Sequence, residues 1–171
     1  MNHMLDLETM STKTDAAIVQ IANVIINFNT GEIVNEFYCE VSLESSVKCG
    51  GTMSASTVLF WMRQPDEARE ALQRGCSIQE ALKKLTEFMD SIDSIKNRKV
   101  WGNGAAFDAP ILRSAYERLG LETPWSFRNE KCYRTVADMH PNIPIVYKGI
   151  KHNALSDAKN QAKHLTKIIK S

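Results

Sequence analysis

Two carboxylates lie close together near the start of the chain. Residues 2–7 favour a short strand, and Asp6 and Glu8 flank Leu7 at its end. Because side chains alternate along a strand, Asp6 and Glu8 share one face and Leu7 points to the other. Like charges about 4 Å apart repel by about 4 kcal/mol at an effective dielectric constant near 20. A proton or a bound cation relieves this repulsion, although an Asp-x-Glu triplet alone is also typical of a solvated strand end.

Two further carboxylates are predicted in the first turns of helices. Asp108 lies in the first turn of a predicted helix, shortly after a predicted strand at 99–102. Asp157 lies in the first turn of the predicted helix at 154–169, five residues after His152. The positive end of a helix dipole stabilises a carboxylate there, so each acid also has a purely structural explanation. Ligands of mixed sheets, however, bind beyond the carboxyl ends of parallel strands, where these acids are expected.

Taken together, the four acids predict a phosphoryl-transfer site. An oxygen-rich set of ligands suits Mg²⁺ or Mn²⁺. Two such ions about 3.5–4 Å apart hold the attacking and leaving oxygens of an in-line displacement. The imidazole of His152, with an ordinary pKa of about 6.5, can deprotonate an attacking water near neutral pH.

Hydrophobic patterning predicts the elements that position these residues. Residues 17–28 are apolar on both faces, as in a central strand, and residues 33–41 alternate. A turn signal between them makes 17–41 an antiparallel hairpin. The alternation places Ile33, Phe37, Cys39 and Val41 on one face, and Glu36, Tyr38 and Glu40 on the other.

The rest of the chain alternates between helices and strands. Ser77 to Glu80 form a capping box before a strongly periodic helix at 78–93. The remaining predicted elements are a loop at 42–56, a short helix from Pro65 to Gly75, strands at 99–102 and 131–138, and helices at 107–119 and 154–169. The helix at 154–169 is predicted to point five apolar residues inward: Leu155, Ala158, Ala162, Leu165 and Ile169. This order predicts an α/β fold with a mixed sheet, three antiparallel strands followed by parallel strands, flanked by helices in one domain over 1–171.

Composition narrows the class of protein. Hydrophobic residues make up 43% and charged residues 24% of the 171 residues, as in an ordinary globular protein. No apolar run approaches the about 20 residues of a membrane span, and no secretory signal is visible. Four scattered cysteines argue against a zinc site and a disulfide framework, so a cytoplasmic location without a membrane partner is expected.

Charge is unevenly distributed along the chain. The net charge is +1, but residues 128–171 carry nine basic and three acidic residues. This basic third either faces an anionic polymer or forms a solvated lysine-rich helix. The sequence leaves both interpretations open.

In three motifs the sequence resembles the DEDDh branch of the DnaQ-like 3′–5′ exonucleases, which have an RNase H-like fold. The first motif is similar to Asp6-Leu7-Glu8-Thr9, the second to Asn103 through Phe107-Asp108, and the third to His152-x-x-x-x-Asp157. The stretches 60–69 and 132–135 look similar to a bacterial and phage subgroup that is related to RNase T and often described as 3′ exoribonuclease-like. The motifs occur in the family's order and extend over nearly the whole chain.

The resemblance implies a role for each matching residue. Asp6 would bridge two metal ions, Glu8 and Asp157 would complete the site of the nucleophilic water, and Asp108 would hold the second ion. His152 would be the general base. Thr9 and Met10 would contact the sugar and base of the terminal nucleotide, and Asn103 would support the second motif. Many relatives carry an Asp where this chain has Cys132, which is not a metal ligand in the pattern.

The resulting hypothesis is a metal-dependent 3′–5′ exonuclease that releases 5′-mononucleotides from the 3′ ends of single-stranded or 3′-overhanging DNA or RNA. An endonuclease of the same fold and a non-catalytic nucleic-acid-binding module are the alternatives. Related enzymes are commonly dimers, so a homodimer is also suggested. Phe60 or Trp61 would stack on a terminal base unless it belongs to the core. His3, His140 and His164 match no motif and are expected at the surface or at caps.

Overall fold

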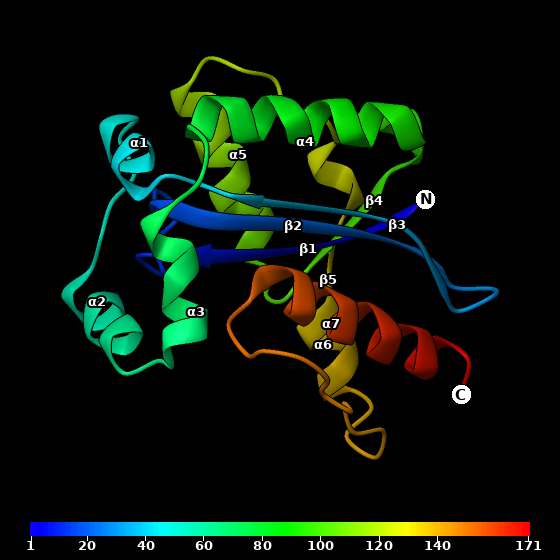
Figure 1. Ribbon diagram of the computed structural model, residues 1–171. Coiled ribbons are helices and arrows are strands. Elements are labelled where there is room, and N and C mark those ends of the chain that lie inside the picture. Colours follow the sequence, from blue (N-terminus) through cyan, green and yellow to red (C-terminus); the bar gives the residue numbers. More distant parts are fainter.

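A five-stranded mixed sheet forms the centre of the molecule, in the order β3-β2-β1-β4-β5 (Figure 1). The structure, a computed structural model, describes residues 1–171 except for the side chain of Ala71. The strands are β1 (Asn2–Thr9), β2 (Ile18–Asn27), β3 (Glu32–Glu40), β4 (Lys99–Gly102) and β5 (Glu130–Cys132). β1, β2 and β3 pair antiparallel, whereas β4 runs parallel to β1 and β5 parallel to β4. The predicted mixed sheet is confirmed.

Helices cover both faces of this sheet (Figure 1). α4 and α5 pack on one face, and α6 and α7 on the other, while α1, α2 and α3 lie beyond one end. The helices are α1 (Leu43–Lys48), α2 (Ala55–Met62), α3 (Asp66–Glu70), η1 (Ala71–Gln73), α4 (Ile78–Ile92), η2 (Ile95–Asn97), α5 (Asp108–Arg118), η3 (Phe127–Asn129), α6 (Tyr133–Asp138) and α7 (Ala154–Ile169). Within the described part of the chain, none of them has the length and apolar character needed to cross a bilayer.

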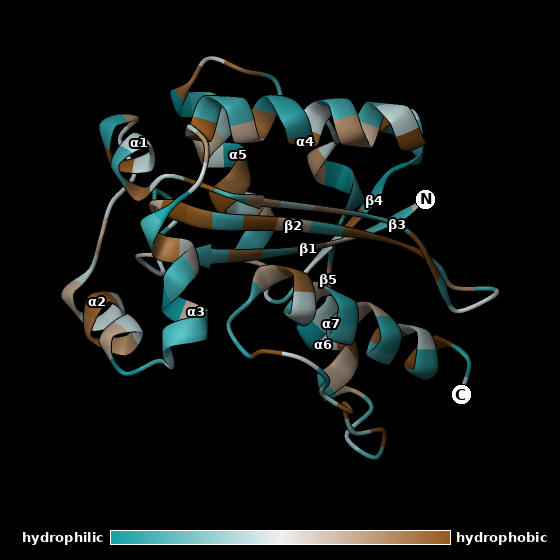
Figure 2. Ribbon diagram, in the orientation of Figure 1, coloured by the Kyte–Doolittle hydropathy of each residue, from teal (hydrophilic) through white to brown (hydrophobic). Residues whose placement is uncertain are grey.

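Alternation along β1 divides the core into two layers. Leu5 and Leu7 pack with α4 and α5, whereas Met4 packs with α7. Figure 2 shows hydrophobic residues along the central strands and hydrophilic ones on the outward side of the helices. Since the face of Met4 is also the face of Asp6 and Glu8, this alternation directs both carboxylates toward α7.

The caps of the two longest helices explain their boundaries. The Ser77 hydroxyl accepts a hydrogen bond from the Glu80 N–H at 3.2 Å, as the capping box predicts. The Asn153 side chain accepts one from the Ser156 N–H at 3.0 Å at the start of α7. At the end of α7 the prediction was wrong by one residue, because Ile168 is buried and Ile169 is half exposed.

Two predicted segments differ from the structure because polar residues act as caps. The predicted loop at 42–56 contains α1 and the start of α2, whose N-terminal N–H groups are bonded by Ser42 and Ser54. The predicted strand at 131–138 ends at Cys132, whose Sγ accepts a hydrogen bond from the Thr135 N–H and caps α6. The two serine hydroxyls and the cysteine sulfur satisfy free N–H groups at the start of these helices.

A β-bulge changes the predicted alternation of β3. Pairing with β2 shifts register between Ile25 and Ile26, which oppose Asn35 and Ile33. Ile33 therefore packs in the α7 layer, on the opposite side from Phe37 and Cys39.

Two histidines are buried, contrary to prediction. His3 is fully buried between Asn23 and Asp93, and His164 is only 8% exposed. The amphipathic patterns around both residues gave no sign of the polar partners that satisfy their rings. His140 is half-buried, and its Nδ1 lies 2.8 Å from the Val136 carbonyl.

Candidate active site

The four predicted acids meet at the carboxyl end of β1. Asp6 and Glu8 come from β1, Asp108 from the first turn of α5 and Asp157 from the first turn of α7. Asp6 and Asp108 are buried, whereas Glu8 and Asp157 are partly exposed. Segments separated by up to about 150 residues thus converge because β4 lies beside β1 and both helices begin at this end of the sheet (Figure 1).

Asp108 is held by main-chain amides at the point where β1 and β4 cease to pair. The pairing ends at Met4, so the Leu7 N–H is free to donate to Asp108 Oδ1 at 3.1 Å. The Asn103 N–H donates to Asp108 Oδ2 at 2.7 Å. A Cβ atom at Gly102 would lie 2.9 Å from Oδ2, so only glycine permits this approach.

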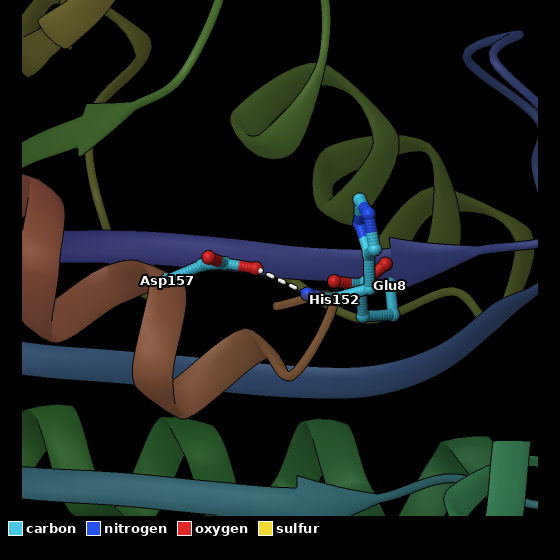
Figure 3. Close-up of side chains that lie close together, drawn as sticks. All are labelled: Glu8, His152 and Asp157. Atoms are coloured by element: carbon cyan, nitrogen blue, oxygen red, sulfur yellow. Dashed lines mark hydrogen bonds between the residues drawn. The ribbon is translucent and has the colours of Figure 1, made fainter. Parts of the chain in front are cut away.

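His152 and Asp157 are fixed to each other by a main-chain bond, drawn in Figure 3. The His152 N–H donates to Asp157 Oδ2 at 3.1 Å, and the Tyr147 hydroxyl donates to Oδ1. His152 has a φ of +60°, which non-glycine residues adopt rarely. Such strain persists where surrounding bonds enforce it, and it concentrates at functional sites.

Glu8, His152 and Asp157 form a candidate metal site. One ligand atom from each lies within 4.8 Å of the others, and Figure 3 shows the three residues grouped at the end of β1. No described Lys or Arg forms an ion pair within 4.0 Å with any of the four acids. The negative charge of the cluster is therefore not neutralised by a side-chain cation.

The raised pKa values of the four acids indicate that the cluster lacks positive charge. Burial, together with the charges of Asp108, Glu8 and Asp157, raises the pKa of Asp6 well above its usual range. Burial and the neighbouring acids raise the pKa of Glu8 to about 8. Burial raises the pKa of Asp108 to about 6 despite its amide hydrogen bonds, and it also raises the pKa of Asp157. Divalent cations would compensate these charges, so the donor set fits hard, oxygen-binding ions.

A cavity of about 360 Å³ opens beside Glu8 and His152. This volume lies in the range of small-ligand sites. Hydroxyl groups and aromatic rings share its wall. The wall includes Thr9, Ser11, Thr12, Ser56, Thr57, Phe60, Trp61 and Phe107.

Both aromatic side chains of α2 line the cavity, but they differ in exposure. Trp61 is buried and its indole N–H donates to the Thr9 carbonyl at 2.9 Å. Phe60 is 37% exposed, and its ring meets the imidazole of His152 edge-on at 4.9 Å. Phe60 is therefore the one placed to meet a ligand.

The two residues predicted to contact substrate have different positions. Thr9 lines the cavity, while the Met10 side chain is buried against Trp61 and Ala68 and does not line it. Asn103 lies behind the site, where its carbonyl and side chain accept hydrogen bonds from Arg134 at 2.8 and 3.3 Å. The functional roles of these residues stay predictions.

Three supporting residues were missed by sequence reasoning. The Gln161 amide donates to Asp6 Oδ1 at 2.6 Å. Gln161 follows Asp157 by four residues, so helical spacing already placed it on the same face of α7. Gly102 was visible as a strand end, but its close approach to Asp108 was not. Tyr147 lies in an irregular segment whose pattern gave no signal.

Comparison with solved structures gives the same fold. The nuclease domain of 3′hExo, a DEDDh family member solved with rAMP, superposes with a TM-score of 0.70 at 16% identity, over 99% of this chain and 91% of that one. Exonuclease X in complex with 5′ overhanging duplex DNA gives 0.60 at 19% identity, over 99% and 92% of the chains. E. coli Exonuclease I with a dT13 oligonucleotide gives 0.64 at 14% identity, over 99% and 40%. These similarities establish the RNase H-like exonuclease fold.

Family comparison is more specific than fold comparison. No curated protein matches the chain. The family model described as the 3′–5′ exoribonuclease Rv2179c-like domain, by contrast, matches residues 1–169, which include all three motifs. The chain therefore belongs to the Rv2179c-like family of 3′–5′ exoribonuclease domains and is a nuclease.

Proposed function

We propose that this nuclease removes 5′-mononucleotides one at a time from the 3′ end of single-stranded or 3′-overhanging RNA, with DNA as a weaker substrate. The observation that carries the proposal is the convergence of four acids and His152 beside a cavity of about 360 Å³. The family description supports RNA as the preferred polymer. A cytoplasmic location and a homodimer are further expectations from the sequence.

The acids would hold two divalent cations, Mg²⁺ or Mn²⁺. Asp6 is central, because the charges of the other three acids all act on it. Glu8 and Asp157 are the acids that adjoin His152. When bound, such ions stabilise negative charge on the attacking and leaving oxygens.

His152 would act as the general base. Its main-chain bond to Asp157 fixes the turn that carries the imidazole, and Phe60 contacts one edge of the ring. An imidazole so placed accepts the proton of the attacking water as the water oxygen bonds to phosphorus and the 3′ oxygen of the remaining strand departs.

The cavity would hold the terminal nucleotide. The exposed Thr12 and Ser56 hydroxyls offer donors and acceptors for a sugar, and Phe60 offers a face for a base. The Thr9 hydroxyl donates to the Ser11 carbonyl at 2.7 Å, so Thr9 would meet a sugar as an acceptor. A pocket of this volume favours a strand end, which supports an exonuclease over an endonuclease of the same fold.

Digestion of 5′-labelled RNA and DNA 20-mers of one sequence, with a circular strand of the same sequence, tests the proposal. We expect shortening by single nucleotides, faster on RNA, with the circle intact and EDTA abolishing release. His152→Ala is expected to lower kcat at least about a hundredfold, as for a lost general base. Cleavage of the circle would identify an endonuclease, and binding without release would identify a non-catalytic module.

A further inference from the structure

A second cavity lies on α7, outside the cluster of four acids and outside the first cavity beside Glu8 and His152, which we call the nucleotide cavity after its proposed occupant. It has a volume of about 240 Å³ and is formed between α7 and the segment 144–148. Its wall includes Val146, Lys148, Asn160, Lys163, His164 and Lys167. We call this the lysine groove, after Lys148, Lys163 and Lys167.

The charge of the lysine groove is uncompensated. Lys148, Lys163 and Lys167 are exposed, and none forms an ion pair within 4.0 Å among the described residues. On the same helix, Lys159 does form one, with Glu36 at 2.6 Å. Asp157 is the only acidic residue after Asp138 in the sequence. The groove therefore attracts anions.

Buried polar side chains hold the wall of the groove in place. The Asn160 amide, 5% exposed, accepts from the Lys148 N–H at 2.9 Å and donates to the Lys148 carbonyl at 2.8 Å. His164 Nε2 lies 2.6 Å from the Ile143 carbonyl and Nδ1 lies 2.7 Å from the Tyr133 hydroxyl. A carbonyl only accepts, so Nε2 donates to Ile143, and the second bond to Tyr133 fixes the orientation of the ring. The segment 143–148 is thus held against α7, so the backbone that forms the groove is preformed.

The lysine groove continues from the candidate active site. Tyr147, next to Lys148, donates to Asp157, and Asn160 follows Asp157 by one helical turn. Ten residues of α7 separate Asp157 from Lys167, which is about 15 Å along the axis, or about four stacked nucleotides.

We infer that the lysine groove binds the phosphates of the strand upstream of the scissile bond, so that the enzyme favours strands of several nucleotides over dinucleotides. This inference rests on the proposed function. It assigns the basic C-terminal third of the chain to a polyanion, in place of a merely solvated helix. The contacts are to phosphate and carry no base preference.

The test compares two double variants. The groove variant carries both Lys163→Gln and Lys167→Gln, and the matched control carries both Lys96→Gln and Lys99→Gln. The control removes the same charge from η2 and from the first residue of β4, away from the acids. For RNA and DNA 20-mers, we expect the groove variant to raise KM about tenfold and to reduce the slope of log KM against log salt by about 1.4. Dinucleotide kinetics should stay unchanged in both variants.

The inference is overturned if the control raises KM as much as the groove variant, or if dinucleotides and 20-mers are affected equally. If the wild-type protein hydrolyses neither substrate, the proposed function fails, and anisotropy of a fluorescein-labelled 20-mer in EDTA tests the groove alone. Weaker binding in the groove variant only would then support the groove, and equal affinity in all three proteins would refute it.

Discussion

The two ends of β1 each carry a cluster of buried ionisable groups, but only one cluster is neutralised. At the amino end, Arg98 is 1% exposed and donates to Asp90 at 2.7 Å and to Asp93 at 3.2 Å. His3 lies 3.2 Å from the same Asp93, and burial lowers its pKa to about 4 against the opposing effect of that carboxylate. At the carboxyl end, Asp6, Glu8, Asp108 and Asp157 lie close together, and no described Lys or Arg forms an ion pair with them.

This difference separates a structural cluster from a functional one. A buried charge with partners of opposite sign stabilises a fold only weakly, but it is costly to disrupt. A buried set of like charges is destabilising unless a ligand neutralises it. The carboxyl end of β1 therefore gives up stability in the metal-free protein for the capacity to bind cations.

Asp6→Asn should break the functional end while sparing the fold. We expect hydrolysis to fall by about a thousandfold or more, because Asp6, on which the charges of the other three acids act, would help to hold the proposed ions. The metal-free protein should become more stable at pH 7, since a carboxylate whose pKa is raised has been replaced. Single-turnover assays and urea unfolding in EDTA measure the two effects. Retained activity would remove Asp6 from the site.

Arg98→Met should destabilise the fold while leaving the activity of the folded protein unchanged. Removing Arg98 leaves the Asp93 and Pro124 carbonyls without their donor and takes a cation away from the Asp93 carboxylate, which keeps the Met1 ammonium and His3, so the free energy of unfolding should fall by about 3 kcal/mol. Since the network lies at the far end of β1, kcat per folded molecule should be unchanged. A large loss of kcat in protein shown by circular dichroism to be folded would mean that the two ends are coupled.

Gly102→Ala should sharpen the comparison by displacing one acid without removing its charge. The added Cβ would lie 2.9 Å from Asp108 Oδ2, so the carboxylate must move. We expect activity to fall about 10- to 100-fold, as when the support of a metal ligand is disturbed. Gly120→Ala is a useful control, because its Cβ would meet no atom within 4 Å; Gly120 has a φ of +65°, which Gly102 does not share, so this variant should lose stability but keep its activity. A Gly102 variant with wild-type activity would contradict the account of how Asp108 is held.

The smallest expected effect is on pH dependence. The pKa of Glu8 is raised from 4.5 to about 8 in the folded protein, so the folded state holds more protons than the unfolded state between these values. Stability of the metal-free protein should therefore fall as pH rises from about 4.5 to 8. The full shift corresponds to about 5 kcal/mol, and because solvent reaches the partly exposed Glu8, we expect a loss on the order of 1–2 kcal/mol. Urea titrations in EDTA should show this slope, and saturating Mg²⁺ should flatten it. A slope unaffected by Mg²⁺ would indicate that the acids do not bind the ion.

Sequence reasoning was most successful where periodicity and caps are local. The central hairpin, α4 and α7 follow directly from apolar spacing and from Ser77 and Asn153. It failed where a polar residue had two interpretations, as at Ser42 and Cys132, which cap helices in segments predicted to be a loop and a strand.

The candidate site shows the same division. The four acids and His152 were visible because their types and order carry chemistry. Their neighbours were not, because the bonds from Leu7 to Asp108 and from Gln161 to Asp6 join positions separated by 101 and 155 residues. The bulge that reverses Ile33 depends on pairing with β2 and has no local signal.

The bond from Trp61 to Thr9 joins a wall of the nucleotide cavity to the strand that carries Asp6 and Glu8. The indole is buried, so this bond ties the α2 wall of the cavity to the carboxyl end of β1. In the proposed function, the seating of a terminal nucleotide against α2 and the placing of the two β1 carboxylates would therefore depend on one shared contact.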